Sequence, residues 1–299
     1  MTTDASTEIY KEQAHALRKR AERVYEEFFS QTDEKGKCVC PYLQNCLGSR
    51  ALGEHSINSD LALRIGDRYG EDTIVPKVLF IGKESVAYHD KVGKTSSSPS
   101  DNNPHYRCTL LTIAYLIEAL HGDDTKIAAL NAAVEKHDFD GITIDRLLRD
   151  YSDSFALTNF YKCAFKGSAK RSGIKNTAAQ NKNCVRLLLK EIECIRPRIM
   201  IKQTTAGSRQ FEENLQNIAE KDPGARFCGK PLYEAQGNRI SAYKYALRPS
   251  AGSARVFPDT FYVVYTYHPC ARGEYSFNRS WECLKKAIDS ILKDLSKDT

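Results

Sequence analysis

The 299-residue sequence lacks the features that mark several large classes of protein. It contains no run of about 18 apolar residues, so we expect no membrane-spanning helix. Its first residues, MTTDASTEIYKEQ, hold no apolar signal core, which predicts an intracellular, cytoplasmic protein. Phosphate-loop, Gly-x-Gly-x-x-Gly and Gly-x-Ser-x-Gly motifs are absent, which argues against a small-molecule hydrolase or transferase. The ordinary glycine and proline content excludes collagen-like and low-complexity chains.

The net charge of +6 conceals two halves of opposite sign. Residues 1–150 carry 19 Lys and Arg against 24 Asp and Glu, a net charge of −5. Residues 151–299 carry 25 against 14, a net charge of +11. Basic halves often face phosphates, so this distribution favours a nucleic-acid partner. We expect a monomeric protein that binds DNA and not a membrane.

Apolar periodicity predicts an alternation of strands and helices along the chain. A helix is expected over residues 6–30, where apolar side chains recur at helical spacing. Apolar runs predict strands at 78–81, 154–159, 196–204, 239–247 and 259–268, and amphipathic segments predict helices at 109–121, 180–195 and 280–295. This alternation indicates a three-layer α/β/α fold with a central, mostly parallel sheet. We expect an N-terminal helix over 1–37 and one α/β domain over 38–299.

Polar side chains follow three of the predicted strands. They are Gly82-Lys83-Glu84 after the first, Asn159 after the second and His268 after the last. Because ligands of open α/β sheets bind at the carboxyl ends of strands, these residues are candidates for one shared site. Each also has a simpler interpretation, since Glu84 suits a solvated loop, Asn159 a turn cap and His268 a structural role.

The motifs FIGKESVAYHD (80–90), LTNFYKC (157–163), NKNCVRLLL (181–189) and YTYHPC (265–270) occur in this order. Together they resemble the uracil-DNA glycosylase superfamily, and its iron–sulfur branch most closely, over roughly residues 38–295. The resemblance implies a fold of that type and an enzyme that flips uracil or a related deaminated base out of DNA and hydrolyses its glycosidic bond. A catalytically inactive nucleic-acid-binding protein of the same fold is the alternative.

The resemblance also implies roles for single residues. Asn159 would recognise the edge of the base and Gly82 would line the pocket, while His268 would donate a hydrogen bond to the uracil O2 region. Tyr106 is the candidate for stacking on the base, with His105 second; alternatively, Tyr106 only holds its loop in place.

The acidic position of the FIGKESVAYHD motif (80–90) is where this sequence departs from the family. Glu84 would position water or balance positive charge on the sugar, and Asp90 matches a further acid of the iron–sulfur branch. Lys83 stands where one form of the motif has its acid, and Ser85 and Val86 replace the residues that usually follow. These departures leave open whether the chain acts on uracil, on another lesion or on none.

Ten cysteines are many for a chain expected in a reducing compartment, where thiols and metal ligands are commoner than disulfides. Cys163 and Cys184 fall where the iron–sulfur branch has cluster ligands, and Cys40 and Cys46 are the preferred N-terminal pair. These four imply a [4Fe–4S] cluster, with Cys38 as a substitute for either N-terminal ligand and zinc as the alternative metal. The other cysteines are interpreted as reduced, buried thiols: Cys108, Cys194, Cys228 and Cys283. Cys270, just after His268 and Pro269, could instead line the site.

Basic residues cluster just after the Asn159 strand. Lys166, Lys170 and Arg171 lie in a segment without acidic residues, and Arg272 follows His268 closely. These side chains are candidates for contacts with DNA phosphates, which give affinity without reading sequence. A solvated surface loop would have the same composition.

Overall fold

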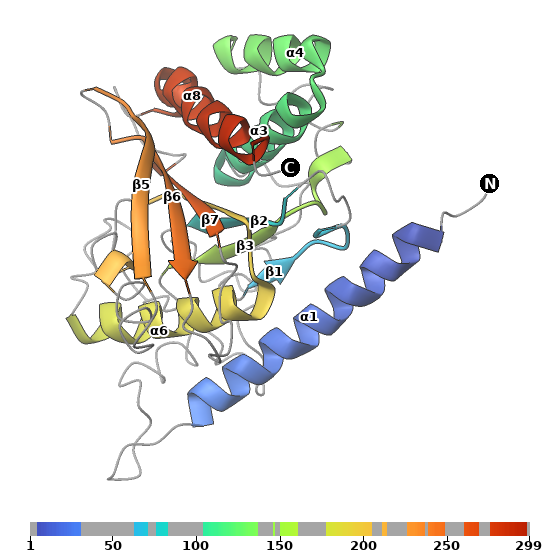
Figure 1. Cartoon of the computed structure of the whole chain (residues 1–299). Helices are drawn as coiled ribbons and strands as arrows, with labels where there is room; N and C mark the ends of the chain where they lie inside the picture. The colour runs from blue at the N-terminus through green and yellow to red at the C-terminus, as the bar shows by residue number, and fades with distance from the viewer. Residues whose placement is uncertain are drawn as a thin grey trace, which may run out of the picture.

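The computed structural model describes residues 5–30, 63–70, 76–82, 104–136, 146, 150–160, 178–204, 211–213, 226–236, 239–248, 260–268 and 276–297. Within them, seven strands form one sheet with helices on both faces (Figure 1). The prediction of an α/β protein with a central sheet is therefore confirmed.

The strand order in the sheet is β1-β3-β2-β4-β7-β6-β5. Four strands, β2 (Val78–Gly82), β3 (Ala156–Asn159), β4 (Ile199–Lys202) and β7 (Thr260–Tyr265), pair in parallel. Antiparallel strands flank this core: β1 (Arg64–Ile65) on one side, β6 (Ser241–Arg248) and β5 (Arg226–Glu234) on the other. The strands that precede the candidate site residues are thus all in the parallel core, and the antiparallel strands lie at its two edges.

The core strands form where the sequence has short runs of buried, β-branched or aromatic residues. All residues of β2 and β4 are buried, as expected for parallel strands covered by helices on both faces. The sequence pattern does not predict β5, because Gly229 and Pro231 interrupt its alternation. Proline is tolerated there because β5 lies at the edge of the sheet, where a missing N–H breaks no ladder on the outer side.

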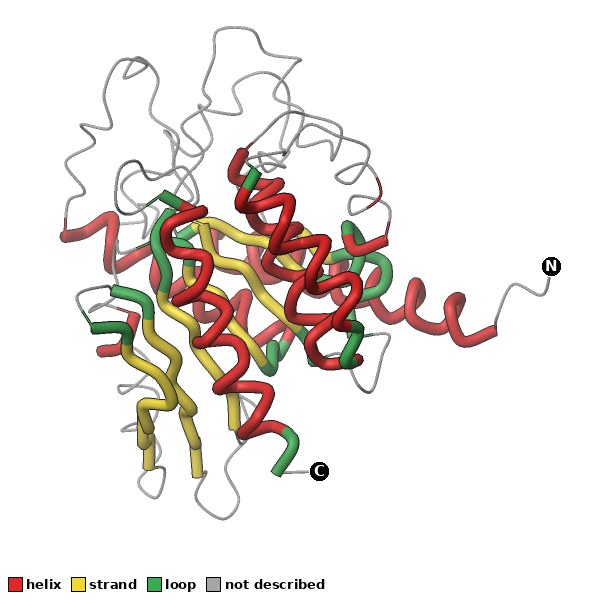
Figure 2. Tube along the Cα trace, turned by 90° about the horizontal axis from the view of Figure 1, so that it is seen from above, coloured by secondary structure: helices red, strands yellow, loops and turns green. Residues whose placement is uncertain are grey.

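One face of the sheet is covered by α1 (Ala5–Ser30) and α6 (Ala178–Ile195). Buried residues of α1, including Ala14, Ala21 and Tyr25, share a core with α6 and with the strand residues Leu79 and Ile81. The Tyr25 hydroxyl donates to the buried Glu191 carboxylate of α6 and accepts a 2.7 Å hydrogen bond from the Leu63 amide. The N-terminal helix is therefore packed into the same core as the sheet, although its first turns extend beyond the body (Figure 2).

The other face is covered by α3 (Pro104–His121), α4 (Asp124–Glu135) and α8 (Phe277–Leu295), which lie in front of the strands in Figure 2. Trp281 of α8 packs against Tyr115 of α3 with ring centroids 5.5 Å apart, and its indole N–H donates to Asn131 of α4 at 2.9 Å. No helix among the described residues has the length and apolar character needed to cross a membrane.

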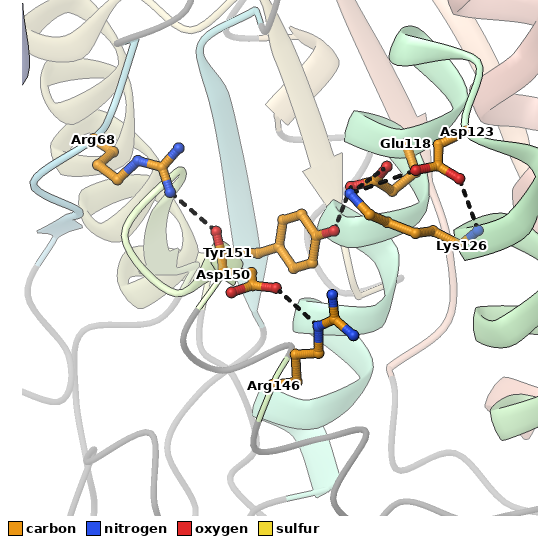
Figure 3. Close-up of polar contacts among 7 residues, drawn as sticks. All are labelled: Arg68, Glu118, Asp123, Lys126, Arg146, Asp150 and Tyr151. Atoms are coloured by element: carbon orange, nitrogen blue, oxygen red, sulfur yellow. Dashed lines mark hydrogen bonds and ion pairs between the residues drawn. The ribbon is translucent and has the colours of Figure 1, made fainter.

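A buried polar network joins α3 to the segment that enters β3 (Figure 3). Glu118, only 2% exposed, accepts a hydrogen bond from the Tyr151 hydroxyl, and both of its oxygens accept from Lys126 Nζ, at 3.0 and 3.1 Å. Tyr151 precedes β3, so this network lies at the amino end of the strands. Its groups are satisfied by one another, which is the pattern of a structural network rather than of a ligand site.

Candidate active site at the carboxyl edge of the sheet

The carboxyl ends of the four parallel strands form one continuous edge. Hydrogen bonds continue from strand to strand at this edge: Phe160 N donates to Gly82 O at 2.8 Å, Gln203 N to Ile81 O at 2.9 Å and Thr266 N to Lys202 O at 3.0 Å. The ends of β3, β2, β4 and β7 therefore lie next to one another in that order.

The chain reverses its direction of winding at β2. From β2 it passes to β3 on one side, and then returns across β2 to β4 and β7 on the other. Such a reversal opens a crevice between the two strands on either side of it, here β2 and β4, and ligands of doubly wound sheets bind there. The candidate site is accordingly centred on the ends of β2 and β4.

Three of the predicted site residues lie at this edge. Gly82 and Asn159 are register partners on adjacent strands, so the glycine and the amide are direct neighbours. His268 follows β7, a strand that lies three strand spacings, about 14 Å, from the β3 strand that carries Asn159. Asn159 and His268 are partly exposed, and both make interactions within the molecule.

Three buried polar residues at the end of β4 were not predicted. Lys202, Gln203 and Thr204 are 0, 2 and 3% exposed, and they occupy the centre of the edge, between Gly82 and His268. Gln203 Oε1 accepts a 3.1 Å hydrogen bond from Thr109 of α3, which fixes the position of its amide. The signal in the sequence was the polar ending KQT of an otherwise apolar strand, RPRIMIKQT.

Lys202 is the only lysine among the fully buried side chains of the described residues. Its Nζ donates to the Thr204 carbonyl at 2.6 Å and lies 5.6 Å from the centre of the Phe160 ring. Burial lowers the pKa of the Lys202 amine to about 7, an effect that the nearby Glu212 carboxylate partly opposes. At neutral pH a substantial fraction of this amine is uncharged.

Tyr106 lies in the first turn of α3, one turn before Thr109, which donates to Gln203 at the carboxyl edge. Its ring is partly buried against Phe155, with centroids 6.2 Å apart, at the beginning of β3. Burial raises the pKa of Tyr106 to about 12, with a smaller contribution from the Asp153 carboxylate. These contacts favour the interpretation in which Tyr106 holds the start of α3 on the sheet.

Cys184 is buried on α6, on the opposite face of the sheet from Tyr106. The helices α1 and α6 run antiparallel, because Leu17 O lies 3.7 Å from Cys194 Sγ whereas Phe28 and Arg186 line one hollow. The end of α1 is thus near the part of α6 that holds Cys184. The chain leaves α1 at Ser30, and the predicted N-terminal ligands follow within 16 residues, at Cys40 and Cys46.

The remaining predicted site residues lie outside the described residues. They are the carboxylate Glu84, the basic residues Lys166, Lys170, Arg171 and Arg272, and the cysteines Cys38, Cys40, Cys46 and Cys163. In the described part of the chain, no three His, Cys, Asp or Glu side chains come together as a metal site, but only Cys184 of the predicted ligands belongs to that part.

Comparison with known proteins gives no assignment. Neither the protein-family models nor the curated proteins contain a match to this chain. The case for a function therefore depends on the motifs and on the geometry of this edge.

Proposed function

We propose that the protein is a DNA glycosylase that excises uracil or a related deaminated base. The observation that carries the proposal is the carboxyl edge itself: Asn159 is the register partner of Gly82, and His268 follows a strand of the same parallel core. These residues come from three motifs, since Gly82 and Asn159 lie 77 positions apart and Asn159 and His268 lie 109 apart, and each motif resembles a glycosylase element.

The chemistry suits this set of groups. A base in duplex DNA must be flipped into a pocket before its glycosidic bond can be hydrolysed. The Asn159 amide offers a donor and an acceptor, which complement the O4 and N3–H edge of uracil. His268 donates to the O2 side, where negative charge develops as the bond breaks, and Glu84 positions water or stabilises the positive charge on the sugar.

The basic residues after Asn159 and His268 extend this site toward a DNA backbone. Lys166, Lys170 and Arg171 follow β3 in the sequence and Arg272 follows β7, and both strands end at the carboxyl edge. Phosphate contacts of this kind give affinity that falls steeply as salt rises. We propose that they hold the strand whose base enters the site.

The decisive experiment is a base-excision assay. Purified protein is incubated with labelled single- and double-stranded oligonucleotides that carry one uracil, hypoxanthine or xanthine, and alkali then cleaves any abasic product. We expect strand cleavage at uracil or at one of the two other bases, and none in the matched oligonucleotide with cytosine. Salt-sensitive binding without cleavage would instead support the inactive binding protein, which the departures at Lys83, Ser85 and Val86 favour. Absence of binding at low salt would reject both.

We further propose a [4Fe–4S] cluster on Cys40, Cys46, Cys163 and Cys184. The antiparallel packing of α1 on α6 supports it, because the chain that carries the first two cysteines starts near Cys184, and Cys163 follows β3 by four residues. Four thiolates are the usual donor set of such a cluster. Its role would be to tie these three segments together beside the carboxyl edge.

Metal analysis tests the cluster directly. Anaerobically purified protein is expected to contain about four iron atoms per chain and to absorb near 400 nm. Cys184→Ser is expected to lose most of the iron, whereas Cys194→Ser, on the same helix with its thiol 3.7 Å from Leu17 O, is expected to keep it. One equivalent of zinc in place of iron would contradict the cluster, and a metal-free wild-type protein would reject the site altogether.

A further inference from the structure

Lys202 occupies a position where a charged group is costly. Its register partners are Ile81 on β2 and Tyr265 on β7, both buried, and its side chain is fully buried on the face of the sheet that α6 covers. An ammonium group in such surroundings loses its hydration and is stabilised only in part by neighbouring dipoles. A fully buried lysine at a strand end inside a candidate site suggests a chemical role.

The groups around Lys202 favour its uncharged form. Tyr265 and Tyr245 lie on the same face with their hydroxyl oxygens 3.2 Å apart, and the Glu191 carboxylate of α6 is engaged by Tyr25 and Thr158. In the part of the chain that the structure describes, the Glu212 carboxylate acts on the amine in the opposite direction, and its effect is smaller than that of burial. A desolvated lysine of this kind is a good nucleophile near neutral pH, because much of it carries no proton.

The amine also lies at the correct end of the strand. Nζ donates to the carbonyl of Thr204, two residues beyond the amine's own position, so the side chain is directed toward the carboxyl edge rather than along the sheet. Leu157 packs on the α3 side, and strand alternation puts Asn159 on that side as well, opposite to Lys202. A nucleotide whose base contacts Asn159 would have to cross the edge between β2 and β4 for its sugar to reach Lys202.

We propose that the Lys202 amine forms an imine with the aldehyde of an abasic deoxyribose, the product of base excision. This inference rests on the proposed function, because the abasic sugar is what a glycosylase leaves in its own site. The uncharged amine adds to the aldehyde carbon of the ring-opened sugar, and the resulting carbinolamine loses water. One C–N double bond replaces the C=O bond, one water is released, and no oxidant or reductant is required. The capture is reversible and would retain the reactive product on the enzyme.

Trapping with cyanoborohydride tests whether the imine forms. Protein is mixed with an oligonucleotide that already contains one abasic site, and cyanoborohydride reduces any imine to a stable amine. We expect a covalent protein–DNA species on a denaturing gel, formed faster as the pH rises through 7, because only the unprotonated amine attacks. Peptide mapping by mass spectrometry of the wild-type adduct is expected to locate the modification at Lys202.

Lys202→Met is expected to reduce the trapped fraction at least about tenfold. The matched control is Lys244→Met, which removes a lysine that also lies beside an aromatic ring but forms a 2.7 Å ion pair with Asp294. This control is expected to trap like the wild-type protein. Mapping of the adduct to another lysine, or equal trapping by Lys202→Met, would overturn the proposal.

The assay separates this inference from the proposed function, because its substrate is abasic from the start. Excision of uracil without trapping of the abasic oligonucleotide would reject the role of Lys202 and leave the glycosylase standing. Trapping at Lys202 without excision of any base would support the amine and count against the glycosylase. A small aldehyde such as glyceraldehyde, trapped at Lys202 while abasic DNA is not, would overturn the assignment of the sugar as substrate.

Discussion

Asn159→Ala is expected to reduce base excision by about 10²–10³-fold, the usual cost of removing one side chain that stabilises charge or orients the reacting group in the transition state. Asn159 ends β3 beside Gly82, its register partner on β2. β2 itself carries no amide side chain that could replace Asn159. The loss is measured as the single-turnover rate on a uracil-containing oligonucleotide. Asn159→Asp should be comparably slow, because a carboxylate cannot donate to uracil O4 and repels it.

The matched control is Asn131→Ala. Its amide oxygen accepts hydrogen bonds from Trp281 and Lys285, at 2.9 and 3.0 Å, inside the helix layer that contains α4 and α8. Its removal should lower stability without changing the rate of excision per folded molecule. An Asn159→Ala protein that binds DNA and excises uracil at the wild-type rate would contradict the role of Asn159. Loss of excision in both variants at unchanged folding would show that the effect is not specific to the site.

The core strands and the helices could be predicted because their residues agree locally with their final environment. The apolar run of β2 and the amphipathic pattern of α6 leave little alternative, and the helix predicted over 6–30 matches α1. The start of α3 was placed too late, at residue 109 rather than Pro104, since a polar, proline-containing stretch suggests a loop. Proline is nevertheless favoured at the first helical position, where its missing N–H is not needed.

The residues of the candidate site also fall into some that the sequence could place and some that it could not. Residues after a strand, such as Asn159 and His268, could be placed at a common edge because parallel strands end together. Lys202 and Gln203 fall inside the strand predicted over 196–204, but the sequence does not show that these two polar side chains are buried. Their burial depends on contacts with residues far away in the sequence, Thr109 for Gln203 and Phe160 for Lys202, which no local pattern reveals.

Lys202→Met is expected to stabilise the folded protein at neutral pH by about 3 kcal/mol. The pKa of Lys202 falls from 10.5 to about 7 on folding, and each unit corresponds to about 1.4 kcal/mol of penalty on the charged form. Loss of the hydrogen bond to the Thr204 carbonyl offsets about 1–2 kcal/mol of that gain. The free energy of unfolding of both proteins is measured by urea titration at several pH values.

The pH dependence distinguishes this desolvation effect from simple improvement of packing. Between about pH 7 and 10.5 the unfolded wild-type chain binds a proton at Lys202 that the folded chain does not, so wild-type stability rises with pH in this window. The advantage of Lys202→Met should therefore be largest at pH 7 and shrink as the pH approaches 10. Lys244→Met is expected to have the opposite sign near pH 7, because Lys244 donates to Asp294 and thereby lowers the pKa of that carboxyl. A methionine variant at position 202 that is less stable than the wild type at pH 7 would mean that the buried lysine stabilises the fold. The cost of burying Lys202 would then give no support to a chemical role for its amine.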